Sequence, residues 1–259
     1  MPFGRDQPTG LTGPVKAANV NVRMIPGRQS TQDFACILTQ METAAKSTGA
    51  DVALAVARED DDFHPGALVA CGYRVDRVSR SWRLELGDRS AELRLARSNA
   101  RDAMAQIGIE IRSLDDTAHE SIWRELYGLA AETLPDIPST FSEAIPPFED
   151  WLARMHEPGV FVDRIWTAWR DDSLVAYTYL VYPAVGDVST AYTATRKQFR
   201  GLGIARAVKL ESIGQAIELG KHSITTNNDL ENAAILHINS TLGYQSLPGL
   251  VTYVKSLAS

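Results

Sequence analysis

The sequence predicts an α/β protein in which strands and helices are interleaved along the chain. Short apolar stretches, several with alternating polarity, are interleaved with stretches whose apolar residues recur every three or four positions. These are the periods of strands and helices, respectively. In the second half, a turn with two glycines, Arg200-Gly201-Leu202-Gly203-Ile204-Ala205, joins one such strand to one such helix. We therefore expect strands and helices to follow one another along the chain.

The composition is that of a globular protein long enough for two small domains. Of the 259 residues, 44% are hydrophobic and 22% are charged, which allows sizeable cores. The net charge of −6 and the isoelectric point near 5.4 argue against a nucleic-acid partner. Arg196, Lys197 and Arg200 nevertheless predict a local basic site beside the glycine turn.

The sequence also indicates a cytoplasmic protein that has no membrane partner and binds no metal. The N-terminal residues contain no apolar signal core, and no apolar run approaches the ~20 residues of a membrane span. The two cysteines, Cys36 and Cys71, lack metal-type spacing. We expect both to be small buried hydrophobic residues in a reducing compartment.

The first half is expected to follow an irregular lead-in, residues 1–19, which is rich in Pro, Gly and Thr. The expected elements are a strand at 20–25, a helix at 31–47, a buried strand at 51–57, an acidic loop with a short helix at 60–72, and a strand or hairpin at 73–86. The charged stretch 88–101 is interpreted as a linker, although Leu93, Leu95 and Ala96 also allow a helix.

The second half is expected to form a longer series of elements, with Gly220 and Gly243 each ending a helix. The series consists of a strand at 109–111, a helix at 115–134, a proline-rich bend at 135–147, a helix at 148–155, a hairpin of strands 164–170 and 174–182, a strand at 188–195, the glycine turn, a helix at 206–219, a strand at 222–226, a helix at 230–242 and a strand at 249–255.

The glycine turn is predicted to bind an anion. Gly201 and Gly203 let backbone N–H groups converge without an intervening Cβ, and the following helix adds its unpaired N–H groups and positive dipole end. A phosphate or pyrophosphate fits such a cradle. A Walker loop is excluded because no Gly-Lys-Ser/Thr follows, and a dinucleotide fingerprint fits poorly because Arg206 stands at its third glycine.

Arg200, Gly203 and Ala205 match the pattern Arg/Gln-x-x-Gly-x-Gly/Ala, which resembles the coenzyme A pyrophosphate loop of the GNAT superfamily of N-acyltransferases. The order of elements over residues 108–259 is similar to that of a GNAT domain. Further on, Thr226-x-Asn228-x-x-x-Asn232, followed by Asn239-x-x-x-Gly243-Tyr244, resembles the late helix of the family and its Gly-aromatic ending. The resemblance implies a GNAT fold for this half, that is, a mixed, mostly antiparallel sheet flanked by helices.

The resemblance also implies acetyl-CoA as cofactor and assigns residues to its parts. The strand end would pair with the pantetheine arm and polarise the thioester carbonyl, and the glycine turn would hold the pyrophosphate. Two asparagines near the last helix would complete the site, although helix capping alone explains such residues. The implied cofactor-binding residues are Thr193, Ala194, Thr195, Arg200, Gly201, Leu202, Gly203, Ile204, Ala205, Asn228 and Asn232.

The catalytic positions depart from the family pattern. Asn239 stands where many members carry a tyrosine that protonates the departing thiolate, and Ser189 stands where a glutamate is frequent. Asp187, two residues before Ser189, is a candidate base acting through water, or simply a turn residue. The bend offers Asp136 or Glu143 as other acids, and His237 is expected at the surface or in packing.

The first half is interpreted as a truncated, degenerate copy of a GNAT unit, with an unrelated packing domain as the alternative. At an offset of 171 positions, Gly49 pairs with Gly220, Gly72 with Gly243, and Trp82 with Tyr253. Residues 28–33 contain no glycine cradle, so this unit is expected to be structural and non-catalytic. The predicted domains are 20–100 and 108–259, after the lead-in.

The predicted function is transfer of an acetyl group from acetyl-CoA to a primary amine of a small molecule. The acceptor would bind between the bend at 135–150 and the hairpin at 164–182, where aromatic residues line the cleft or fill the core. The alternatives are a non-catalytic acyl-CoA-binding module and a nucleotide-binding α/β domain. A monomer and a homodimer are both compatible with the sequence.

Overall fold

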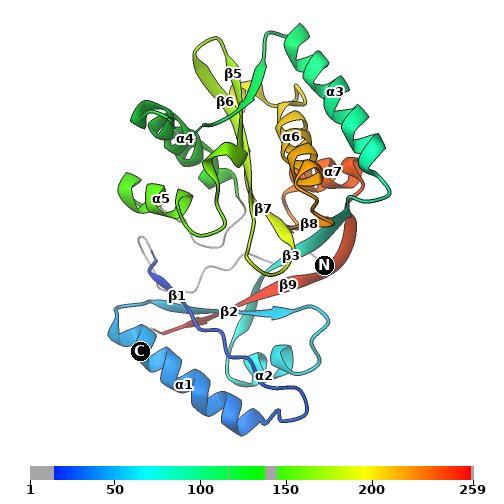
Figure 1. Ribbon diagram of the computed structural model, residues 1–259. Coiled ribbons are helices and arrows are strands. Elements are labelled where there is room, and N and C mark those ends of the chain that lie inside the picture. The colour runs from blue at the N-terminus through cyan, green and yellow to red at the C-terminus, as the bar shows by residue number, and fades with distance from the viewer. Residues whose placement is uncertain (1–14, 116, 138–144, 258–259) are drawn as a thin grey trace.

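The computed structural model describes residues 15–115, 117–137 and 145–257. A single nine-stranded sheet runs through these residues in the order β1-β2-β9-β3-β8-β7-β6-β5-β4, with helices packed against it (Figure 1). The pairs β1·β2 and β7·β8 are parallel, and the other neighbouring strands are antiparallel. The predicted class, a mixed and mostly antiparallel sheet flanked by helices, is therefore confirmed.

The elements of the first half agree with the sequence prediction except at the first strand and in the predicted linker. They are β1 (Ala17–Asn19), α1 (Thr31–Ser47), β2 (Val52–Arg58), α2 (His64–Ala70), β3 (Arg74–Glu85) and α3 (Ser90–Gln106). The strand predicted at 20–25 is wrong, because β1 lies earlier, at the end of the predicted irregular lead-in, and its pairing with β2 ends at Asn19. The predicted linker 88–101 is largely helix α3. Cys36 is exposed and Cys71 partly buried, so the prediction that both are buried is also wrong.

The second half follows the predicted order closely. It consists of β4 (Glu110–Ser113), α4 (Glu120–Thr133), η1 (Leu134–Asp136), α5 (Phe148–Met155), η2 (Val162–Arg164), β5 (Ile165–Arg170), β6 (Ser173–Val181), β7 (Val188–Thr195), η3 (Lys197–Phe199), α6 (Ile204–Glu218), β8 (Ser223–Asp229), α7 (Ala233–Leu242) and β9 (Gln245–Ser256). Most of the proline-rich bend, with Glu143, lies outside the described residues.

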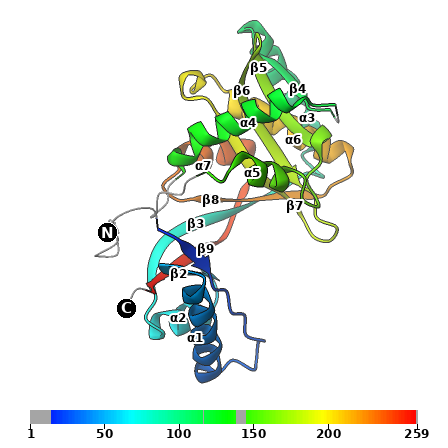
Figure 2. The ribbon, with the colours of Figure 1, turned by 90° about the vertical axis from the view of Figure 1, so that its left-hand side faces the viewer.

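Side chains of β5 and β6 pack against helices on opposite faces of the sheet. Leu174 and Tyr177 belong to a core with α4 and α5, whereas Val175 and Ala176 belong to one with α6. These two adjacent residues share a face because the pairing of β6 with β5 shifts register there and interrupts the alternation. Figure 2 shows α4 and α5 on one side of these strands and α6 with α3 on the other. The site described below lies among β7, α6 and α7, on this scaffold.

Helix α3 is held on α6 by a buried ion-pair cluster. The carboxylate of Glu211 is almost fully buried and accepts hydrogen bonds from Arg97 Nε at 2.6 Å and Arg101 Nε at 2.7 Å. A buried carboxylate is strongly unfavourable without such partners, so the cluster fixes α3 in place. The stretch predicted as a linker is helical because its arginines complete the interior of the second half.

The two halves exchange their last strands. Strand β3 lies between β8 and β9, and β9 pairs with both β2 and β3. The cores are exchanged as well: Leu84 at the end of β3 packs in a core with Leu210 of α6, whereas Tyr253 of β9 packs with Phe34 and Leu38 of α1. The sheet is therefore continuous across the boundary between the two predicted domains.

Element bounds repeat at the offset of 171 residues that relates the glycines. Adding 171 to the bounds of β2 (52–58) gives 223–229, which is β8, and adding it to β3 (74–85) gives 245–256, which is β9. Gly49, Gly72, Gly220 and Gly243 all have a positive φ and follow helices. This correspondence supports the interpretation as a truncated copy, which stays a prediction.

Candidate functional site

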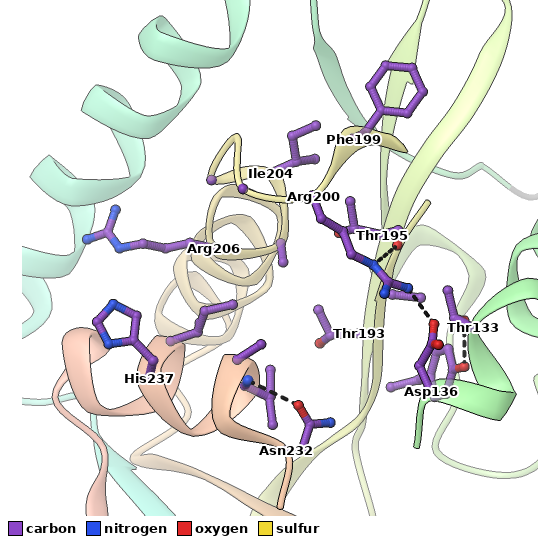
Figure 3. Close-up of a pocket in the computed structure, with 18 of the residues that line it drawn as sticks. Thr133, Asp136, Thr193, Thr195, Phe199, Arg200, Ile204, Arg206, Asn232 and His237 are labelled. Atoms are coloured by element: carbon purple, nitrogen blue, oxygen red, sulfur yellow. Dashed lines mark hydrogen bonds and ion pairs between the residues drawn. The ribbon is translucent and has the colours of Figure 1, made fainter. Parts of the chain in front are cut away.

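A pocket of about 650 Å³ opens where the end of β7, the glycine turn, η1 and α7 meet (Figure 3). Its walls combine the strand end and the glycine turn with one side of α7. The lining residues are Thr133, Asp136, Ile137, Tyr192, Thr193, Ala194, Thr195, Phe199, Arg200, Gly201, Gly203, Ile204, Ala205, Arg206, Asn232, Ala234, Ile235, His237, Ile238 and Thr241.

The pocket exists because β7 and β8 separate. These parallel strands pair only at Val188 with Ile224 and Ser189 with Thr225. The pairing of β7 with β6 shifts register at Ala191, which is left without a partner, and such a bulge bends and twists a strand. Beyond it, Thr193 pairs with β6 on one side only, so the backbone of the strand end has hydrogen-bonding groups free to face the pocket.

The glycine turn presents the start of α6 to the pocket. Gly201 and Gly203 have φ values of 78° and 81°, a left-handed conformation that strains any residue with a Cβ. Gly203 is the N-cap of α6 and provides no side-chain acceptor, unlike Ser30, whose Oγ accepts from Asp33 N at the start of α1. The first N–H groups of α6 therefore remain available to an anion.

The side chains of Thr195 and Asn232 form part of the pocket wall. Thr195 is 9% exposed, and its Oγ1 is buried without a hydrogen-bond partner among the described residues, an orphan polar group that a ligand can satisfy. Asn232 caps α7, because its Oδ1 accepts from Ile235 N at 3.3 Å, and it also lines the pocket.

The predicted local basic site is neutralised, which corrects the sequence interpretation. Arg196 forms ion pairs with Glu125 and Glu132 of α4, both at 3.0 Å. Acidic residues of α4 thus meet a turn more than sixty positions further along the chain, a proximity that no local pattern reveals.

Arg200, expected to supply charge to the anion, is also paired. Its Nη2 donates to Asp136 Oδ2 at 2.6 Å and its Nε to the carbonyl oxygen of Thr195 at 3.1 Å. Lys197 Nζ lies 3.4 Å from Asp136 Oδ1. The hydrogen bond from Arg200 lowers the pKa of Asp136, which is therefore an ionised partner rather than a general base. Arg200 fastens the loop to β7 and η1.

All but two of the predicted cofactor-binding residues line the pocket; the exceptions are Leu202, which is 46% exposed, and Asn228. The lining residues that the sequence did not predict are mostly apolar. Arg206 was noted only because it stands at the third glycine of a dinucleotide-binding motif. The missed residues are Thr133, Ile137, Tyr192, Phe199, Arg206, Ala234, Ile235, Ile238 and Thr241. Apart from Arg206 they carry no motif, although the i, i+3/i+4 spacing of Ala234, Ile238 and Thr241 was available as a signal.

The three predicted catalytic residues do not line the pocket. Asp187 accepts from Arg83 Nη1 and Ser223 Oγ, both at 2.9 Å, and so ties the residue before β7 to β3 and β8. Ser189 pairs with β6 and β8 at the base of the cleft. Asn239 is fully buried, and its Nδ2 donates to Asn228 Oδ1 at 2.7 Å. Their catalytic roles stay predictions.

The described residues offer neither a metal site nor a membrane-spanning helix. They contain no group of three or more His, Cys, Asp or Glu side chains placed to hold a metal ion. None of the helices found there is long and apolar enough to cross a membrane.

The sequence matches no family model and no curated protein. The structure is similar to a GCN5-related N-acetyltransferase from Sphaerobacter thermophilus, with a TM-score of 0.72 and 16% identity over 94% of this chain and 74% of that one. It is also similar to a tandem GNAT protein from the clavulanic acid biosynthesis pathway (TM-score 0.70, 15% identity, 95% and 76% covered). A GCN5-related N-acetyltransferase from Kribbella flavida gives a TM-score of 0.56 at 16% identity, with 87% and 76% covered. The chain therefore has the fold of the GNAT superfamily.

Proposed function

We propose that this protein is an acyl-CoA-dependent N-acyltransferase that transfers an acetyl group from acetyl-CoA to a primary amine of a small molecule. One observation carries the proposal: the opened end of β7, the uncapped start of α6 and the apolar side of α7 border a single pocket. The names of the similar structures, which are N-acetyltransferases and a tandem GNAT protein, support the same chemistry. We propose a cytoplasmic enzyme, either a monomer or a homodimer.

The residues fit the shape and polarity of the thioester cofactor. The backbone N–H groups of residues 201–206 would hold the pyrophosphate. The backbone of residues 193–195, which pairs with β6 on one side only, would pair with the amides of the pantetheine arm on its other side. The orphan Oγ1 of Thr195 offers a further hydrogen bond. The start of α1 is different, because Ser30 caps it and Asp33 adds negative charge. This contrast supports a structural role for the first half.

The protein's part in the reaction is positioning and polarisation. When bound, the thioester supplies an electrophilic carbonyl and a thiolate leaving group whose pKa is near that of cysteine, about 8.5. The chain would align an amine nitrogen with that carbonyl and polarise its oxygen through a backbone N–H group of β7. Because Asp187 and Asp136 are held by arginines, the proton released by the amine would pass to water.

Asn239→Ala is expected to lower turnover only about tenfold, since it removes one hydrogen bond and no acid. Asn239 would position Asn228 and the start of α7 rather than protonate the thiolate. Steady-state thiol release measures turnover, and calorimetry checks that the affinity for acetyl-CoA is kept. A loss of a thousandfold or more with intact binding would mean that the amide acts in the chemistry itself.

The alternative is a non-catalytic acyl-CoA-binding module, which the ion pair of Asp187 with Arg83 and the burial of Asn239 favour. Calorimetry with acetyl-CoA, CoA and NAD is the first test. We expect both coenzyme A compounds to bind and NAD not to bind, whereas binding of NAD alone would indicate a nucleotide-binding domain. Thiol release across a library of primary amines then separates the enzyme from the module.

A further inference from the structure

We propose that Arg206 and His237 recognise the ribose 3′-phosphate of coenzyme A and so select coenzyme A against its 3′-dephospho form. The inference rests on the proposed function, because it names the part of the ligand that one side of the same pocket contacts. It follows from charges that remain unpaired and from the order in which the walls of the pocket occur.

Arg206 is the cation that the pocket leaves without an ion pair. Two arginines line the pocket, and Arg200 is held by Asp136. Within the part of the chain that the structure describes, no carboxylate lies within ion-pair distance of Arg206. Lys197 and Arg196, next to the glycine turn, are paired as well. Positive charge open to a ligand is thus concentrated at Arg206.

The position of Arg206 is unfavourable in the absence of an anion. It lies in the first turn of α6, where the helix dipole is positive and acidic side chains are usually preferred. No acidic residue occupies that turn, and Gly203 provides no cap. A bound phosphate would relieve this repulsion, because an arginine forms strong charge-assisted hydrogen bonds with phosphate oxygens.

The walls of the pocket follow the order of the groups along the cofactor. Figure 3 shows Thr193 and Thr195 towards Asp136, and Arg206 and His237 on the opposite side of the turn. In acetyl-CoA the thioester comes first, then the pantetheine arm, the pyrophosphate and last the phosphorylated ribose. If the thioester lies at β7 and the pyrophosphate at the glycine turn, the ribose phosphate lies towards Arg206 and the exposed His237.

Calorimetry with coenzyme A and 3′-dephospho-coenzyme A tests the inference on the full chain. The native protein is expected to bind coenzyme A about tenfold more tightly, a preference that decreases as salt screens the exposed charges. Arg206→Gln is expected to abolish the preference by weakening the binding of coenzyme A much more than that of the dephospho form, and His237→Gln is expected to reduce the preference. Arg94→Gln, at an exposed arginine of α3 outside the pocket lining, makes the same charge change and is expected to keep the preference.

Thermal unfolding shows whether the Arg206→Gln variant is folded, and its midpoint is not expected to fall, because the variant removes a cation from the positive end of α6. Equal weakening of both ligands in this variant, or no preference in the native protein, would overturn the inference. If neither ligand binds the native protein, the proposed function itself is wrong.

Discussion

Gly203→Glu is expected to abolish binding of coenzyme A while leaving the protein folded. Gly203 is the N-cap of α6 and borders the pocket, so a carboxylate there would occupy the place of a phosphate and accept from the same N–H groups. Binding should fall by at least a hundredfold, below the range of calorimetry, because repulsion between the carboxylate and the pyrophosphate adds to the loss of the N–H groups.

Two effects on stability oppose each other in this variant. A side chain at φ 81° costs about 1–2 kcal/mol, whereas an acidic residue at the start of a helix contributes about 0.3–1 kcal/mol. A Cβ at this position would meet only Met104 Cε at 4.0 Å, so no steric clash is expected. The free energy of unfolding should therefore decrease by no more than about 2 kcal/mol, which chemical denaturation can measure.

Gly203→Gln is the matched control, because it adds the same backbone strain and nearly the same volume without the charge. We expect the glutamine variant to bind coenzyme A measurably more tightly than the glutamate variant. Equal loss in both would show that backbone conformation, rather than charge, determines the effect. Unchanged affinity in the glutamate variant would remove this turn from the binding site.

The sequence was sufficient to predict the turn but not its surroundings. Gly203 and Ala205 carry a local pattern, and the stretch that follows is rich in apolar residues and contains no proline, so both could be found from neighbouring residues. The partner of Arg200 is Asp136, which lies 64 positions earlier. Such a pairing depends on how α4 and η1 pack against β7, and the sequence alone could not distinguish a free basic site from a neutralised one.

The predicted linker in the first half is wrong for the same reason, because its partners lie far away in the sequence. The charged stretch 88–101 has few apolar residues, so it resembles a linker when its arginines are taken to face water. Arg97 and Arg101 instead reach Glu211, more than a hundred positions away, and the helix forms around that contact. Local propensity indicated the elements, whereas their partners in the sheet follow from tertiary packing.

A fragment of residues 105–259, which contains the predicted GNAT domain 108–259, is expected to aggregate or remain unfolded. It lacks β3, which pairs with both β8 and β9, and these two strands are not paired with each other in the sheet. It also lacks Leu84, Leu86 and Leu93, which fill the core between α6 and the sheet. Removing them would expose apolar surface and leave open strand edges, both of which promote aggregation.

Leu84→Ala tests the same exchange in the full chain. Leu84 is fully buried against the second half, so its truncation is expected to cost about 2–5 kcal/mol of unfolding free energy. Leu95→Ala, on α3 with 63% of its surface exposed, should change that free energy by about 0.5 kcal/mol or less. Acetyl-CoA binding, measured beside denaturation, should weaken for Leu84→Ala alone because the helix that bears the glycine turn loses its support.

A 105–259 fragment that unfolds cooperatively as a monomer and binds acetyl-CoA like the full chain would mean that the second half completes its own sheet without β3.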